Sequence, residues 1–225
     1  MSEISPKVAI VDYGMGNLFN LEKVIRHLGG APHFAENSSA VHSAERLILP
    51  GVGAFGDGIA NLQKMGFVEP LVKFAKSGRP FLGICLGMQL FMTQSEEFGL
   101  HQGLNLIAGR VQRLPNPGPS GLFYKIPHVG WNALEVSDSR KGIKSNAAGR
   151  WAGTIFQKLD EGACVYFVHS FIVVPRSPSV VLSETAYGNN NFCSALQQGN
   201  LSGCQFHPEL SGESGLQILR NFLFN

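Results

Sequence analysis

The sequence predicts an α/β fold of three layers, in which helices cover both faces of a mostly parallel central sheet. Three observations support this prediction. Short apolar runs alternate with helical patterns over the first half of the chain, as in consecutive βαβ units. These runs are apolar throughout, which is typical of strands buried on both faces. Strand-like runs in the second half have few helices between them, which adds a smaller antiparallel sheet.

In the first half of the chain, strand-like runs are followed by helical patterns. The run Val8-Ala9-Ile10-Val11 predicts a strand, and the helix after it ends at Gly29-Gly30, because glycine is common just past the last helical turn. Leu47-Ile48-Leu49 predicts a second buried strand, and a third precedes Cys85. The expected elements are strands at 8–11, 47–49 and 80–84 and helices at 18–28, 59–65 and 68–75.

The segment from Leu114 to Gly121 is rich in proline and glycine and predicts a loop. It could join two domains, but the chemistry described below needs residues from both sides of it. A chain of 225 residues, 44% of them hydrophobic, is suited to one core, and we expect a single domain over residues 1–225. Beyond the loop, strands are expected at 131–136, 164–168, 180–186 and 193–196, and an amphipathic helix at 215–224.

Composition and charge exclude several classes of protein. The net charge is +2 and there is no block of Lys or Arg, so nothing indicates a nucleic-acid partner or binding to a membrane surface. The first seven residues are too polar for a signal peptide, and no apolar run approaches the roughly 18 residues that cross a bilayer. The four cysteines are widely spaced without a CxxC pair, which indicates a reducing cytoplasm. No Cys/His cluster suggests zinc, and we expect neither a metal nor a cofactor.

The most informative segment is Gly83-Ile84-Cys85-Leu86-Gly87, which joins the strand at 80–84 to a helix-like apolar run that extends to Met92. A cysteine between two glycines at a strand-to-helix turn has the layout of a nucleophile elbow, because glycine permits a tight turn and close backbone approach. The N–H groups and the dipole of a helix N-terminus favour a thiolate at this place. Taken alone, a single cysteine is more often a small buried hydrophobe.

A second segment, Gln205-Phe206-His207-Pro208-Glu209, follows a short apolar stretch near the end of the chain. Pro208 fixes its own φ and keeps His207 out of the helical conformation, which holds His207 and Glu209 in a set geometry. A cysteine nucleophile needs a base, and the base needs a carboxylate that orients it. A lone His-Pro-Glu is more often a turn, but together at two predicted strand ends Cys85, His207 and Glu209 predict a catalytic triad.

These two segments resemble the signatures of the class-I (triad) glutamine amidotransferases. Within that class, further motifs resemble the glutaminase subunits of imidazole glycerol phosphate synthase, and the likeness runs from about Val8 to Phe224. The resemblance implies a flavodoxin-like three-layer fold. The motifs that carry it lie at Asp12–Asn17, Leu49–Asp57, Pro127–Asn132 and Tyr166–Ser170.

The resemblance implies a mechanism and a set of site residues. Cys85 attacks the side-chain amide carbon of glutamine, His207 gives a proton to the leaving ammonia, and Glu209 orients the imidazole. The oxyanion needs donors about 3 Å away, and the resemblance implies the Leu86 N–H and the glycine-rich segment Pro50-Gly51-Val52-Gly53. The residues expected at the oxyanion site and the glutamine pocket are Gly51, Val52, Gly53, Leu86, Gly87, Gln89, His169, Ser170 and Phe171.

The resemblance also implies a partner. L-glutamine is the expected substrate, and the ammonia passes to a synthase or cyclase subunit of (β/α)8 type with which the chain forms a heterodimer. Taken alone, the loop Asp12–Asn17 is most simply a turn and helix cap, and a tryptophan such as Trp131 is as often a core residue as an interface residue. The expected interface residues are Asn17, Trp131, Asn132 and Leu210.

Position 210 departs from the family pattern. After His-Pro-Glu the synthase subunits usually carry a lysine that pairs with an acidic residue of the cyclase, and Leu210 cannot form this ion pair. The triad is unaffected, but two pathways stay open. The leading function is ammonia supply to imidazole glycerol phosphate synthase in histidine biosynthesis. The alternative is a paralogous glutaminase subunit that supplies ammonia for amidine formation on a surface-polysaccharide sugar.

Other classes of function are disfavoured. The run Pro50–Gly56 contains a G-x-G-x-x-G, a pattern found in dinucleotide-binding sites. Such a site normally has this pattern after the first strand of a βαβ unit and an acidic residue at a later strand end. Here the run does not follow the first strand and Glu69 lies in a helical pattern, so a dinucleotide site is not expected. The complete triad argues against a decayed glutaminase kept only as a binding module, and Gln205–Glu209 argues against a peptidase.

We also expect low activity of the chain in isolation, because an amidotransferase that hydrolysed glutamine freely would waste it. The flexible glycines Gly51 and Gly53 allow the oxyanion loop to stay misaligned until the partner binds.

Overall fold

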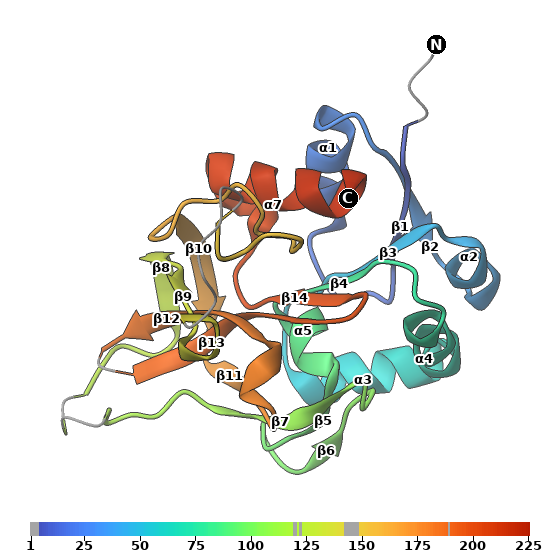
Figure 1. Ribbon diagram of the computed structural model, residues 1–225. Helices are drawn as coiled ribbons and strands as arrows, with labels where there is room; N and C mark the ends of the chain where they lie inside the picture. The colour runs from blue at the N-terminus through green and yellow to red at the C-terminus, as the bar shows by residue number, and fades with distance from the viewer. Residues whose placement is uncertain (1–4, 119–120, 122, 142–148, 189) are drawn as a thin grey trace.

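A computed structural model describes residues 5–118, 121, 123–141, 149–188 and 190–225 of the chain (Figure 1). In this part of the chain a central sheet of eight strands has the order β2-β1-β3-β4-β14-β13-β12-β9. Its first half is parallel and is formed by β2 (Ala31–Ala35), β1 (Lys7–Val11), β3 (Arg46–Leu49), β4 (Phe81–Ile84) and β14 (Leu201–Cys204).

Most antiparallel strands from the second half of the chain extend this same central sheet. Hairpin connections place β13 (Asn190–Gln198) against β14 and β12 (Val181–Tyr187) against β13, with β9 (Glu135–Val136) at the edge. Two smaller sheets lie beside it. One pairs β10 (Cys164–His169) with β8 (His128–Ala133), and the other has the order β11 (Phe171–Pro175), β7 (Ile107–Arg113), β5 (Met92–Ser95) and β6 (His101–Gln102). The predicted α/β class is therefore confirmed.

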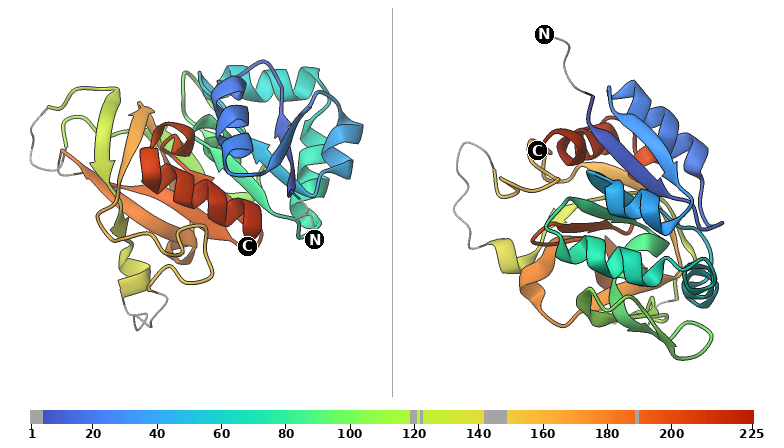
Figure 2. Two further views of the ribbon diagram at one scale, coloured as in Figure 1. Left: turned by 90° about the horizontal axis from the view of Figure 1, so that it is seen from above. Right: turned by 90° about the vertical axis from the view of Figure 1, so that its right-hand side faces the viewer.

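Helices cover both faces of the central sheet, as Figures 1 and 2 show. On one face lie α1 (Leu18–His27) and α7 (Gly212–Phe224); on the other lie α3 (Phe55–Lys64), α4 (Val68–Lys76) and α5 (Leu86–Leu90). The shorter elements are α2 (Ser38–Ser43), α6 (Asp138–Lys141) and the 3-10 turns at Pro178–Val180 and Pro208–Leu210.

Alternation along β1 explains the three layers. Val8 and Ile10 pack in a core cluster with residues of α1 and α7, whereas Ala9 and Val11 pack in a second cluster with residues of α3 and α4. Successive side chains of a strand point to opposite faces, so a run that is apolar at every position buries both faces of the sheet.

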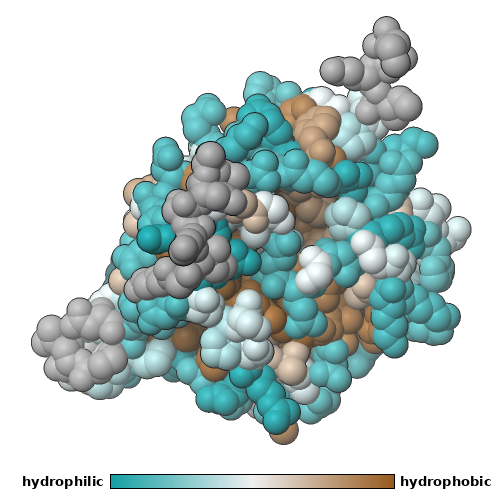
Figure 3. Space-filling model, viewed as in Figure 1, coloured by the Kyte–Doolittle hydropathy of each residue, from teal (hydrophilic) through white to brown (hydrophobic). Residues whose placement is uncertain are grey.

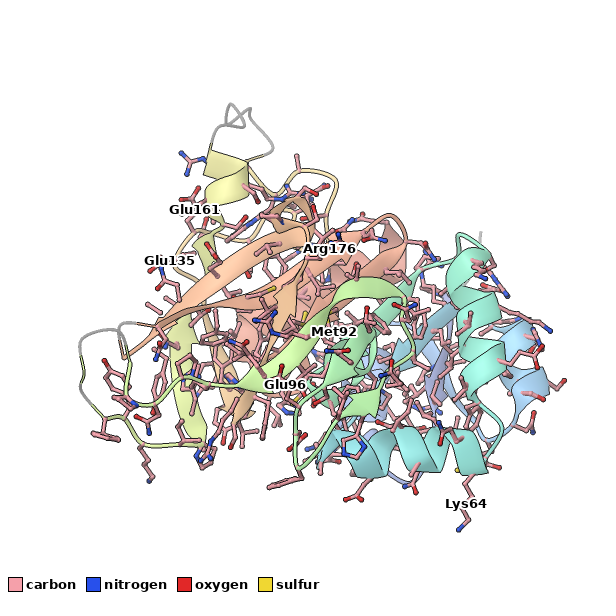
Figure 4. All side chains as sticks on the ribbon, turned by 90° about the horizontal axis from the view of Figure 1, so that it is seen from below. Lys64, Met92, Glu96, Glu135, Glu161 and Arg176 are labelled. Carbon is pink, nitrogen blue, oxygen red and sulfur yellow. The ribbon has the colours of Figure 1, made fainter. Side chains whose placement is uncertain are left out.

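Most predicted elements of the first half are present, with a few shifts and omissions. The edge strand β2 and the helix α2 were not expected, because Ala31-Pro32-His33-Phe34-Ala35 has neither an apolar run nor a clear alternation. Helix α3 begins at Phe55 rather than residue 59. The helix after Cys85 ends at Leu90, and Met92 instead begins β5, whose ends are marked in Figure 4 by Met92 and by Glu96 just beyond it.

The parallel strands bring four loops to one edge of the sheet. In the order β1, β3, β4, β14, their carboxyl ends lead into Asp12–Asn17, Pro50–Gly53, Cys85 and Gln205–Glu209. The register sets Leu49 opposite Gly83 and Ile84 opposite Cys204. Ligands of open α/β sheets bind outside the carboxyl ends of the strands, so this edge is the place to seek the site. In the described part of the chain, every helix is too short or too polar to cross a membrane.

Candidate active site

Cys85 lies in the turn between β4 and α5 with a backbone conformation that is unusual for a residue with a side chain. Its φ is 53° and its ψ is −108°. A non-glycine residue in such a region costs on the order of 1–3 kcal/mol and persists only where its surroundings hold it there. Two backbone hydrogen bonds do so: the Cys85 N–H donates to the Cys204 carbonyl at 2.7 Å, and the Gln89 N–H donates to the Cys85 carbonyl at 3.2 Å.

The two glycines of the elbow are required by close backbone contacts. A Cβ at Gly83 would lie 2.7 Å from the Met88 nitrogen, and one at Gly87 would collide with the Leu49 carbonyl oxygen. The first turn of α5 therefore packs directly on the ends of β3 and β4. This packing confirms the tight strand-to-helix turn that the sequence predicted.

His207 and Glu209 form a buried pair at the end of β14. The His207 Nδ1 and the Glu209 Oε1 are 2.8 Å apart, and the two side chains are only 5% and 6% exposed. The His207 N–H donates to the Tyr166 carbonyl and its own carbonyl accepts from the Ser211 hydroxyl, which fixes the backbone on both sides. Among the residues that the structure describes, His207 Nε2 and Glu209 Oε2 have no hydrogen-bond partner.

The free Nε2 of His207 belongs to an imidazole that is protonated at neutral pH. Burial lowers the pKa of His207, but the Cys85 thiol and the Glu209 carboxylate act against it and raise the pKa from 6.5 to about 10. Cys85 is thus close enough to His207 to interact with it electrostatically, although Nε2 makes no hydrogen bond to it. An imidazolium beside a thiol favours the thiolate.

A cavity of about 140 Å³ opens beside Cys85. It is bounded by the loop after β3, by α5, and by the junction of β10 with β11. Most of the residues predicted for the oxyanion site and glutamine pocket lie around it. Its lining residues are Val52, Gly53, Cys85, Leu86, Gln89, Glu97, Val168, His169, Ser170 and Phe171.

Sequence reasoning missed two of the lining residues, Val168 and Glu97, and the ionisable one is Glu97. It is 8% exposed, and its carboxylate accepts the Phe55 N–H at 2.7 Å at the start of α3. Burial raises the pKa of Glu97, while the bond from Phe55 opposes the shift. The pair Glu96-Glu97 follows β5 directly, and nothing in the sequence distinguishes the exposed acid from the buried one.

His169 is held in the cavity wall as a neutral imidazole. Its Nδ1 lies 3.0 Å from the Phe171 carbonyl, which can only accept, so Nδ1 carries the proton. Its Nε2 then accepts from Nδ1 of His128, also 3.0 Å away. Burial lowers the pKa of His169 to about 3 and that of His128 to about 4. Both histidines are therefore uncharged at neutral pH, in contrast to His207.

The predicted oxyanion donor is occupied in this structure. The Leu86 N–H donates to the Gly51 carbonyl oxygen at 3.4 Å. That oxygen therefore takes the place at the Leu86 N–H that an oxyanion would occupy. The buried Tyr13 hydroxyl donates to the Pro50 carbonyl at 2.8 Å and holds the loop from one side. Gly53 has φ 127°, which a residue with a side chain rarely adopts.

Known proteins resemble this chain along nearly its whole length. A family model described as "Glutamine amidotransferase class-I" matches residues 9–225. The chain belongs to this family. It is 44% identical over 216 residues to "Imidazole glycerol phosphate synthase subunit HisH 1" of Legionella pneumophila (strain Paris), covering 96% of this chain and 98% of that one. It is 46% identical over the same length to the subunit HisH of Syntrophotalea carbinolica, with the same coverage. As a member of this family it is a glutamine-hydrolysing enzyme.

Solved structures agree with the fold of this glutamine amidotransferase. The structure of PurLQS from Thermotoga maritima superposes with a TM-score of 0.68 at 19% identity and covers 98% of each chain. A glutamine amidotransferase from Thermotoga maritima gives a TM-score of 0.59 at 16% identity, covering 98% of this chain and 97% of that one. At these identities the likeness concerns the fold alone.

The residues predicted for a partner interface differ in their surroundings in this amidotransferase. Trp131 is 58% exposed and Leu210 is 42% exposed. Asn17 caps α1, where its side chain accepts the Asn20 N–H at 3.3 Å. The Asn132 side chain is used within the chain: its nitrogen donates to the Ala186 carbonyl and its oxygen accepts the Ala133 N–H. Trp131 and Leu210 are thus the two residues of this set that offer apolar surface.

A metal site does not emerge within the described ranges, where no three His, Cys, Asp or Glu side chains group as a metal ion requires.

The pair His207–Glu209 makes a prediction about protonation. Replacing Glu209 with Gln removes a carboxylate that raises the pKa of His207. The lowering effect of burial is then opposed less, and the pKa of His207 falls well below about 10. Because the wild-type pKa lies above the ordinary 6.5, the charged imidazole stabilises the fold below pH 6.5, and this contribution is lost as pH rises through 10. NMR titration of the His207 ring and urea unfolding between pH 6 and pH 10 test both statements.

Glu213→Gln is the matched control, because Glu213 is exposed in the first turn of α7. It is expected to leave the titration of His207 unchanged. A Glu209→Gln variant in which His207 titrates as in the wild type would contradict the assignment of this pair.

Proposed function

We propose that the chain is the glutaminase subunit of a two-protein synthase, with Cys85, His207 and Glu209 as its catalytic triad. The observation that carries the proposal is a strained Cys85 that lines the cavity and interacts with His207 of the buried His207–Glu209 pair. Because Cys85 and His207 come from opposite halves of the sequence, residues 1–225 would act as one domain. We also propose a cytoplasmic location, in keeping with the unpaired cysteines.

The proposed reaction follows from the protonation states at the site. The Cys85 thiolate forms a bond to the side-chain amide carbon of glutamine, and the carbonyl π electrons move to oxygen. His207, protonated at neutral pH, gives its Nε2 proton to the amide nitrogen, the carbon–nitrogen bond breaks, and ammonia leaves. Water then attacks the thioester, His207 takes a proton from it, and glutamate departs as the thiolate is restored.

Glutamine would bind in the cavity beside Cys85. Its side-chain amide would lie between Cys85 and the loop Val52–Gly53, where the Leu86 and Gly87 backbone closes the first turn of α5. Gln89, His169, Ser170 and Phe171 would line the wall around its methylenes and carboxylate. Among the lining residues Glu97 is the one acid, and we assign it to the α-ammonium group.

The ammonia acceptor would be a synthase or cyclase subunit of (β/α)8 type that forms a heterodimer with this chain. Histidine biosynthesis is the preferred pathway, because the relatives at 44% and 46% identity are named as subunits of imidazole glycerol phosphate synthase. Trp131 and Leu210, together with the half-exposed Val52 at the cavity, would face the partner. At Leu210 the contact would be apolar rather than the ion pair that a lysine makes.

The nucleophile is tested by Cys85→Ala. This variant is expected to release no glutamate from glutamine, because no other group at the cavity can form the thioester. Mixed with the partner synthase and given ammonium salt, it should still support formation of imidazole glycerol phosphate at the wild-type rate. Cys164→Ala, at the exposed cysteine of β10, is the matched control and should keep both activities. Glutamine hydrolysis retained by Cys85→Ala would refute the proposal.

The substrate pocket is tested by Glu97→Gln. Loss of a charged contact to the α-ammonium should raise KM for glutamine by about 10-fold or more, with a smaller change in kcat. The neighbouring Glu96→Gln is the matched control, because Glu96 is exposed and its carboxylate lies 3.8 Å from Arg110 rather than in the cavity. An unchanged KM in Glu97→Gln would remove Glu97 from the glutamine site.

Partner dependence is tested by comparing the free chain with the complex. Since the Leu86 N–H is bonded to the Gly51 carbonyl, the free chain lacks an oxyanion donor, and one such donor is worth about 100- to 1,000-fold in kcat. Glutaminase turnover should therefore rise by about 100-fold when the partner is added.

Trp131→Ala should weaken this stimulation by lowering affinity for the partner. Equal turnover of the free chain and the complex would show that the Gly51 carbonyl does not limit activity.

A further inference from the structure

Gln205 is a buried carboxamide beside Cys85 to which the mechanism above gives no role. It precedes Phe206-His207 at the end of β14, and its side chain has no exposure to solvent. Its amide nitrogen lies 3.7 Å from the Cys85 sulfur and donates to it. This carboxamide can stabilise a thiolate only if its nitrogen, and not its oxygen, faces the sulfur.

The orientation of Gln205 is set by a neighbouring amide. The Gln89 nitrogen donates to the Phe171 carbonyl at 3.2 Å and to the Gln205 side-chain oxygen at 3.1 Å. The Phe171 carbonyl can only accept, so Gln89 must present its NH₂ group there. The same NH₂ group then requires an acceptor from Gln205, which turns the Gln205 oxygen toward Gln89 and its nitrogen toward Cys85. The hydrogen-bond network therefore decides the assignment.

The Phe171 carbonyl is itself held by a second donor. Nδ1 of His169 donates to it at 3.0 Å, and His169 in turn accepts from His128. His128 is 2% exposed and stacks between Phe167 and Tyr187, with ring centroids 4.9 Å and 4.0 Å away. One backbone carbonyl thus fixes the polarity of a buried chain that runs through Gln89 and Gln205 to the sulfur.

We propose that Gln205 is a catalytic residue that donates a hydrogen bond to the Cys85 sulfur, with its orientation imposed by Gln89 and the Phe171 carbonyl. This inference rests on the proposed role of Cys85 as the nucleophile. A donor to sulfur stabilises the anion more than the neutral thiol or the thioester. Gln205 therefore favours the thiolate before attack, and it favours the return of the electron pair to sulfur when water breaks the thioester.

Gln205 acts on the sulfur in addition to two ionisable groups. Among the described residues, His207 from the end of β14 and Tyr13 from the loop after β1 interact electrostatically with Cys85. His207 is cationic at neutral pH, whereas burial raises the pKa of Tyr13 and keeps it neutral. The uncharged Gln205 differs from both, because its contribution does not change with pH.

The test measures the ionisation of Cys85 without glutamine. In a Cys164→Ser background, iodoacetamide alkylates Cys85 at a series of pH values and mass spectrometry of the Cys85 peptide follows the rate. Gln205→Glu places an acceptor against the sulfur in the same volume. Gln89→Glu leaves Gln205 in place but offers it a carboxylate, which should turn the Gln205 nitrogen away from Cys85. Gln198→Glu is the matched control, because Gln198 is an exposed glutamine at the end of β13, the strand that precedes β14.

Both test variants should shift the midpoint of the alkylation profile upward by about one pH unit, while the control stays at the wild-type midpoint. In the complex, Gln205→Glu should lower kcat for glutamine hydrolysis by about 10- to 100-fold. Wild-type midpoints in both variants would overturn the inference. If Gln205→Glu fails to fold, as judged by thermal unfolding, the midpoint of Gln89→Glu decides alone.

The two proposals fail in different ways. If Cys85→Ala still hydrolyses glutamine, the proposed function fails and Gln205 loses its role with it. If Cys85→Ala is inactive while Gln205→Glu and Gln89→Glu titrate and turn over like the wild type, the triad stands and only the role of Gln205 is refuted.

Discussion

The parallel pairing of β4 with β14 is the constraint on which the rest of the site depends. It sets Ile84 opposite Cys204, and the Cys85 N–H extends the pairing by one residue through its bond to the Cys204 carbonyl. Cys85 and Gln205 are 120 residues apart in sequence, so no local interaction could bring them together. The site therefore forms only when this long-range ladder forms, and its chemistry is tied to the stability of the sheet centre.

The same junction holds the strain of Cys85. The turn remains tight because Gly83 and Gly87 let α5 rest on the ends of β3 and β4, and because Gly203 of β14 leaves room for Met88. Hydrophobic residues gather toward the middle of the face shown in Figure 3 and hydrophilic ones surround them. A backbone held by packing on three neighbouring strands has little freedom to relax, which is the condition for a strained residue to persist.

Sequence patterns revealed the parts of the molecule that carry a strong local signal. Strands 8–11, 47–49 and 80–84 are apolar at nearly every position, and the cysteine elbow and the His-Pro-Glu segment depend on few residues in fixed order. The strand β5 was missed because Met92 continues an apolar helical run and the three residues after it are polar. Glu97 was missed because its burial arises from Phe55, 42 residues earlier, and Gln205 because its orientation depends on a carbonyl in another sheet.

Burial alone does not decide the charge of the three histidines near the cavity. His128 and His169 accept from or donate to neutral groups, so desolvation dominates and lowers the pKa of both. His207 is buried to a similar degree, but Glu209 and Cys85 are its partners, and the pKa rises to about 10. Two neutral histidines and one cationic histidine that interacts with Cys85 leave a single mobile proton near the sulfur, where the proposed mechanism needs it. Changing the groups that contact each histidine, rather than how deeply it is buried, would therefore change which imidazole is protonated.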